Sequence, residues 1–190
     1  MMNKAEAKKL YGVLEGRVLA GERKADIYAG YLDAADAARC AKVLAQIPTP
    51  SRRSRFRLLN WILVADLGVL ALIKLFVMTL FVLTQIPKGF VLILIAPLIN
   101  IWIMWMVAKF RAIGYLLVIA FGFTGLSKVM EGFQKSVDSL DMTLNSINLV
   151  CVVSAMVIAG ILMRKLLPNT SFLLRPKTKT DGTERPQFEE

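Results

Sequence analysis

Four long apolar blocks limit what this chain can fold into more than any other feature of its sequence. They are nearly free of charged side chains and cover about residues 58–83, 90–108, 112–127 and 147–163. A helix needs about 20 apolar residues to cross a hydrocarbon core roughly 30 Å thick. The blocks therefore predict an all-α integral membrane protein with four transmembrane helices in residues 58–165. The third block is short unless its helix extends beyond Ser127.

Positive charge alternates along the links between these blocks. The segment before the first block, the link at Lys109–Arg111 and the pair Arg164–Lys165 are basic, whereas Ser127–Ser146 mixes both signs. Because Lys and Arg collect in cytoplasmic loops, both termini are predicted to be cytoplasmic. We expect a multi-pass protein of the cell membrane, which is the inner membrane in a Gram-negative cell.

The polar ends of the chain are expected to form separate parts. Residues 1–50 predict a cytoplasmic helical hairpin, because apolar residues recur every three or four positions in 3–21 and 25–46. Gly21 is expected to end the first helix. Residues 51–57 form a basic juxtamembrane segment, and residues 166–190 are rich in Pro, Thr and charge, which predicts a disordered cytoplasmic tail.

Basic and aromatic residues mark the predicted cytoplasmic interface. The arginines of the juxtamembrane segment are expected to contact lipid phosphates, each contributing about 1 kcal/mol, and they are Arg52, Arg53, Arg55 and Arg57. Aromatic residues concentrate at membrane interfaces. The four that fall at this level are Trp61, Trp102, Trp105 and Tyr115.

The composition argues against several functional classes. The net charge is +10, but no base-stacking aromatic platform accompanies it, so we expect a lipid bilayer as partner and no specific nucleic acid. The chain has no His and only two cysteines, Cys40 and Cys151, so no zinc site, metal or other cofactor is expected. No catalytic motif is present, so the chain is not expected to be an enzyme.

A few polar residues inside the apolar blocks are expensive in lipid. Asp66 and Lys74 each cost about 2.5–3.5 kcal/mol at a helix centre. Such residues usually face another helix or a water-filled cavity rather than lipid, and they are often functional. Asn100 lies at the depth of Asp66 in the antiparallel second block, which predicts an Asp66–Asn100 hydrogen bond, while Lys74 is expected to extend outward. Pro97 is expected to kink the second block.

Small residues at helical spacing in the first and fourth blocks predict close packing, partly between subunits, and hence a homo-oligomer.

The leading functional hypothesis is a non-enzymatic membrane scaffold or sensor that recruits or regulates a soluble cytoplasmic protein. One alternative is an oligomeric pore or membrane-depolarising component, of the kind found in bacterial antiviral defence systems, with the intramembrane polar residues as its path. A second alternative is an immunity or exclusion protein. The sequence leaves these three open, and leaves open whether Asp66 and Lys74 join helices or line an ion path.

Overall fold

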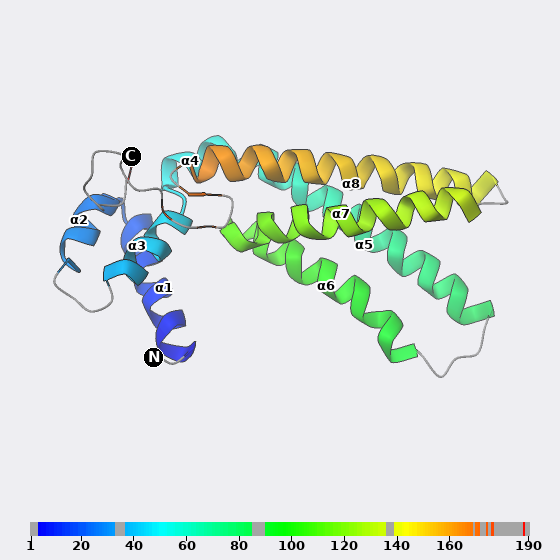
Figure 1. Ribbon diagram of the computed structural model, residues 1–190, viewed down its shortest axis with the longest axis horizontal. Helices are drawn as coiled ribbons and strands as arrows, with labels where there is room; N and C mark the ends of the chain where they lie inside the picture. Colours follow the sequence, from blue (N-terminus) through cyan, green and yellow to red (C-terminus); the bar gives the residue numbers. More distant parts are fainter. Residues whose placement is uncertain are drawn as a thin grey trace. The chain divides into compact units, whose positions relative to one another are not determined.

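The computed structural model describes residues 4–32, 37–84, 90–135 and 139–168, together with residues 170, 171, 174, 176 and 188. Within these residues the regular structure is helical, with no strand and one isolated β-bridge between Thr170 and Pro176 (Figure 1). The all-α prediction is confirmed. The chain divides into two compact units, residues 58–162 and the two ends of the chain, 1–57 with 163–190.

Long apolar helices make up the first of these units, the membrane unit. They are α5 (Arg57–Thr84), α6 (Phe90–Ala108), α7 (Ala112–Lys135) and α8 (Ser139–Leu166). Among the described residues, three spans are long and apolar enough to cross a membrane, at Arg57–Val77, Ala112–Gln134 and Ser139–Leu166. Only 28% of the most apolar stretch of each span is buried within the chain, which leaves a large apolar surface of the kind that lipid or another membrane helix covers. The chain is therefore a helical membrane protein.

Helices α7 and α8 are longer than the third and fourth apolar blocks. The segment Ser127–Ser146 is not a loop, because α7 continues to Lys135 and α8 begins at Ser139. This segment holds good helix formers such as Lys, Met, Glu and Gln. Polar residues mark the ends of the apolar blocks, but polar residues alone do not end a helix. The third block is therefore long enough to span.

Glycines of α7 leave room for side chains of α8 along an antiparallel pairing. Added Cβ atoms at Gly122, Gly125 and Gly132 would meet Met156, Val152 and Asn145 respectively. As the residue number rises along α7 it falls along α8, and the two helices lie side by side in Figure 1. Glycine at an interface lets backbones approach, which is how helices associate in lipid.

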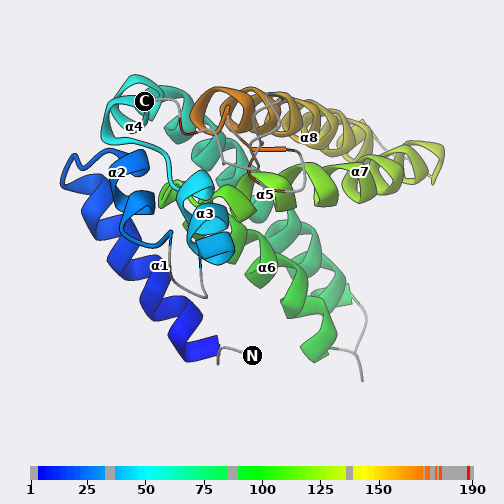
Figure 2. The ribbon, with the colours of Figure 1, turned by 60° about the vertical axis from the view of Figure 1, so that its left-hand side comes forward.

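The N-terminal unit packs three helices around its own core. They are α1 (Lys4–Leu19), α2 (Lys24–Ala29) and α3 (Ala37–Gln46), which contact one another (Figure 2). The core consists of almost fully buried side chains, namely Leu14, Val18, Ile27, Cys40, Leu44 and Ile47. In the C-terminal segment, the Leu174 carbonyl accepts a hydrogen bond from Gln46 at 3.1 Å and Phe188 packs on Tyr28. The prediction of a disordered tail otherwise concerns residues outside the described part.

Helix boundaries in this unit follow glycine and proline. Gly21 adopts φ +92°, and bonds from its N–H to Val18 and from Glu22 N–H to Arg17 close α1 as a Schellman motif. The expected second helix over 25–46 is wrong as one element, since α2 ends at the Gly30 cap. Residues 33–36 lie outside the described part.

The basic juxtamembrane segment is largely helical, which the sequence analysis did not anticipate. Helix α4 (Pro50–Arg55) begins with proline at its first position, where the missing N–H costs nothing, and Phe56 alone separates it from α5.

Candidate functional site

A buried amide on α5 forms the most enclosed polar contact of the membrane unit. Asn60 is 1% exposed; its Nδ2 donates to the Val107 carbonyl at 3.0 Å, and its Oδ1 accepts from the Tyr115 hydroxyl at 2.7 Å. These two bonds join α5 to the end of α6 and the start of α7. Asn60 was not among the predicted site residues, although an amide within an apolar block is a usable signal.

The turn between α6 and α7 is built to present Val107 to this amide. Phe110 adopts φ 55°, and the bonds Phe110 N–H to Val107 and Arg111 N–H to Met106 form a Schellman closure. The cations Lys109 and Arg111 lie 4.2 and 5.2 Å from the ring centroid of Trp105. Such cation–π contacts each contribute about 0.5–1 kcal/mol at exposed sites.

The four aromatic residues predicted to lie at the membrane interface differ in their exposure. Trp61, Trp102 and Trp105 are about half exposed, as side chains at a lipid interface would be. Tyr115 does not belong with them, because it is fully buried against Asn60. A tyrosine with a polar partner inside the protein has no need of the interface.

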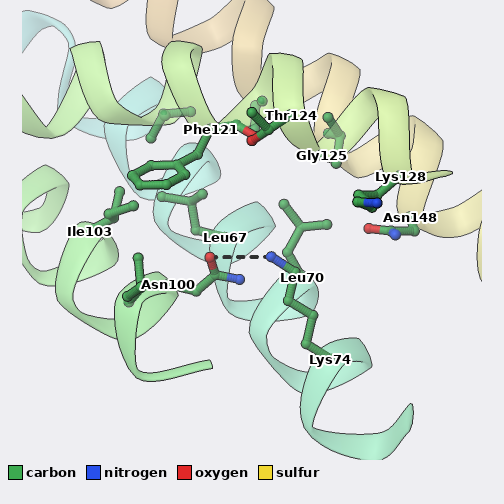
Figure 3. A pocket seen from close by; sticks show the side chains of 15 residues that line it. Leu67, Leu70, Lys74, Asn100, Ile103, Phe121, Thr124, Gly125, Lys128 and Asn148 are labelled. Atoms are coloured by element: carbon green, nitrogen blue, oxygen red, sulfur yellow. Dashed lines mark hydrogen bonds between the residues drawn. The ribbon is translucent and has the colours of Figure 1, made fainter. Parts of the chain in front are cut away.

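The predicted Asp66–Asn100 hydrogen bond is wrong. Asn100 Oδ1 instead accepts from Lys74 Nζ at 3.4 Å, a long contact that links α5 to α6 (Figure 3). On a helix with 100° per residue, Lys74 lies about 40° from Asn60 around the axis, whereas Asp66 lies about 120° away. Lys74 thus shares the face of α5 that meets α6, and Asp66 does not. The prediction compared depth alone and neglected rotation.

Asp66 pairs with α8. Its Oδ2 accepts a short hydrogen bond from the Ser154 hydroxyl, which also bonds the Cys151 carbonyl at 3.1 Å. The Cys151 thiol lies three residues earlier on the same face of α8 and interacts with the same carboxylate. The two charged residues of α5 therefore find neutral hydrogen-bonding partners on two different helices.

A cavity of about 330 Å³ opens between the four membrane helices. Ligand sites commonly measure roughly 300–1,000 Å³, so the volume suffices for a small ligand or part of a larger one. Figure 3 shows Lys128 and Asn148 side by side in one part of it, with Leu67, Ile103 and Phe121 in another. The cavity therefore has a polar part and an apolar part.

The polar part lies away from the α6–α7 turn. Lys74 follows Asn60 by 14 residues and Lys128 follows Ala112 by 16, which correspond to about 21 and 24 Å along their helices. Asn148 Oδ1 is buried there without a hydrogen-bond partner among the described residues. Lys128 bonds Glu131 at 3.0 Å. Chemically, the cavity offers the Lys128 cation and the Asn148 amide in one part and the Lys74–Asn100 pair in another, between apolar side chains.

The remaining predicted site residues are dispersed. Pro97 lies buried inside α6, and the kink expected there stays a prediction. Arg53 bonds Glu15 at 2.8 Å within the N-terminal unit, and Arg55 lies over the Phe56 ring. Arg52 lies on α4 and Arg57 begins α5, and their binding to lipid phosphate stays a prediction for all four arginines.

Comparison with protein-family models, with curated proteins and with solved structures finds no match to the chain. No group of three or more metal-ligating side chains occurs among the described residues. The argument for function therefore depends on the geometry alone.

The Asp66–Ser154 contact predicts coupled stability between α5 and α8. Ser154→Ala should lower the free energy of unfolding by about 0.6–2 kcal/mol, the range for intramembrane hydrogen bonds. In an Asp66→Leu background the same change should have little effect, because the acceptor is gone. Denaturation of the purified protein in mixed detergent measures both.

Ser146→Ala is the matched control, because its hydroxyl bonds only to the Met142 carbonyl of its own helix. It should cost little in either background. If Ser154→Ala lowers the free energy of unfolding of the Asp66→Leu protein as much as that of the wild type, the Asp66–Ser154 hydrogen bond does not couple α5 to α8.

Proposed function

We propose that the chain crosses the membrane four times, with α6 as the crossing between α5 and α7. Its 19 residues correspond to about 28 Å, close to the roughly 30 Å of a hydrocarbon core. Helix α6 also packs against α7 after a tight turn. With four crossings, the alternation of Lys and Arg places both termini in the cytoplasm.

Reporter fusions test this topology. Fusions after Arg111 and after Lys165 should report the cytoplasmic side, and a fusion between Lys135 and Ser139 should report the opposite side. A fusion after Lys165 on the same side as the one between Lys135 and Ser139 would mean that α8 does not cross, and a fusion after Arg111 on the non-cytoplasmic side would mean that α6 does not cross.

We further propose that the protein is a non-enzymatic membrane scaffold, whose N-terminal unit recruits or regulates a soluble cytoplasmic protein. The observation that carries this proposal is the separate core of the N-terminal unit, in which six apolar side chains are buried without help from the membrane helices. A juxtamembrane tether would need no such core. A packed helical unit offers a fixed surface to a partner, and α4 and α5 attach it to the bilayer.

The polar contacts of the membrane unit support the scaffold proposal. Asp66, Lys74 and Asn100 are each engaged with another side chain of the chain, and the contacts join different pairs of helices. This is what polar residues do when they hold helices together in lipid. An ion path instead needs polar groups that remain available to the permeating species.

Association into a homo-oligomer belongs to the same proposal. Large apolar side chains of α5, α7 and α8 are exposed, and a neighbouring subunit would cover part of them. A Cβ added at Gly68 would lie 3.8 Å from the Met104 sulfur, so that member of the small-residue face on α5 already packs within the chain.

The cavity favours one rival function, an oligomeric pore or depolarising component. Lys74, Lys128 and the unpartnered Asn148 oxygen place polar groups inside the membrane unit, which a bare anchor does not need.

Membrane potential separates the two proposals. A scaffold should leave the potential of expressing cells, measured with a potential-sensitive dye, equal to that of cells with an empty vector. A pore should lower it, and Lys74→Met should then restore it while Lys165→Met should not. A depolarisation that depends on Lys74 contradicts the scaffold proposal.

A further inference from the structure

A second cavity, of about 300 Å³, lies within the N-terminal unit. The turn after α1 and the start of α2 line one side of it through Gly21, Glu22 and Lys24. Thr49, Pro50 and Ser51, at the start of α4, line the other. The Thr49 and Ser51 hydroxyls lie 3.2 Å apart, so one donates to the other and the second retains a free proton.

Lys24 is the unusual residue of this cavity. It is only 8% exposed, and it has no hydrogen bond or ion pair among the residues that the structure describes. Lysine is almost never buried so deeply without a partner. Burial of an unpaired charge is costly, and the cost here is raised by repulsion from Arg52 and Arg53.

The neighbouring carboxylates do not neutralise Lys24, because each is paired with an arginine. The pairs, at N–O distances of 2.6 to 2.8 Å, are Arg17–Glu22, Arg23–Asp26 and Arg53–Glu15. The Arg52 guanidinium likewise has no partner in the described part of the chain. Among the described residues, Lys24 thus lines an open cavity without a counterion, beside a hydroxyl pair with a spare proton, and the unpaired Arg52 lies near enough to repel it.

We propose that this cavity is an anion site for a phosphate group, with Lys24 as the cationic ligand and the Thr49–Ser51 pair as hydroxyl donor. Arg52, which does not line the cavity, adds to the positive field at Lys24. The phosphate supplies the negative charge that the described residues do not place beside Lys24. It would come from a lipid headgroup or from a soluble phosphate ester. This site goes beyond the scaffold proposal and does not depend on it.

The lowered pKa of Lys24 agrees with a cation site that lacks its anion. Burial, with Arg52 and Arg53, lowers the pKa of Lys24 to about 8. Because this folded-state pKa lies below the ordinary 10.5, the unfolded chain binds more protons, and stability without anion should rise between about pH 8 and 10.5. A bound anion opposes that loss of the proton and should bind most tightly below about pH 8.

The first experiment compares three versions of the full chain in phosphatidylcholine nanodiscs. Phosphate at ten times its Kd should raise the melting temperature of the wild type by roughly 3–6 °C. Lys42→Met, which removes an exposed lysine of α3, should respond equally. Lys24→Met should fold, because it removes an unpaired buried charge, but it should not respond.

Nanodiscs that contain phosphatidylglycerol distinguish the two sources. If the phosphate is a lipid headgroup, the wild type should melt higher in these discs than in phosphatidylcholine alone, without added phosphate, and Lys24→Met should not. If the ligand is a soluble phosphate, only added phosphate should raise the melting temperature of the wild type. Absence of any shift, or an equal shift in the wild type and Lys24→Met, overturns the proposal.

Sulfate provides the pH test, since its charge is constant near neutral pH. Its affinity for the wild type should fall by up to tenfold per pH unit above about pH 8. The other charged groups near Lys24 are Glu22, Arg23, Arg52 and Arg53, and the ordinary pKa values of these types lie far from this range. An affinity that does not change between pH 7 and 9.5 contradicts the assignment of Lys24 as ligand.

Discussion

The absence of water from the bilayer core is the constraint on which the rest of the membrane unit depends. A polar side chain there must find its partner within the protein. Asn60 joins α5 to the α6–α7 turn, Lys74 joins α5 to α6, and Asp66 joins α5 to α8. Helix α5 therefore makes a polar contact with each of the other membrane helices, and Asn60, Asp66 and Lys74 mark the faces that it turns toward them.

The N-terminal unit depends on a different force. Its core is apolar and excludes water, and glycine and proline set the ends of its short helices. The cavity lined by Lys24 is an exception, since this buried cation has no counterion in the described part of the chain. One chain thus combines a unit stabilised by hydrophobic burial with a unit stabilised by helix packing and paired polar groups. The scaffold proposal assigns partner binding to the first unit and attachment to the bilayer to the second.

Much of the fold was predictable, because local patterns determine it. Helix α6 has the bounds of the second apolar block, Phe90–Ala108. Gly21, which was expected to end the first helix, forms the turn that follows α1. The ends of α7 and α8 were missed, because hydropathy reports on burial in lipid and not on helix length. The site was harder to predict. Asp66, Lys74 and Asn100 were identified as costly, but their partners depend on helix rotation, and Ser154 became visible only once α8 was placed.

The Lys74–Asn100 contact gives the most direct test of the claim that polar pairs hold the membrane helices together. A double-mutant cycle with Lys74→Met and Asn100→Leu, read as unfolding free energy in mixed detergent, measures the coupling between the two side chains. We predict a favourable coupling of about 0.6–2 kcal/mol. Additive effects would contradict this account, because they would show that the charge of Lys74 is sheltered by something other than Asn100.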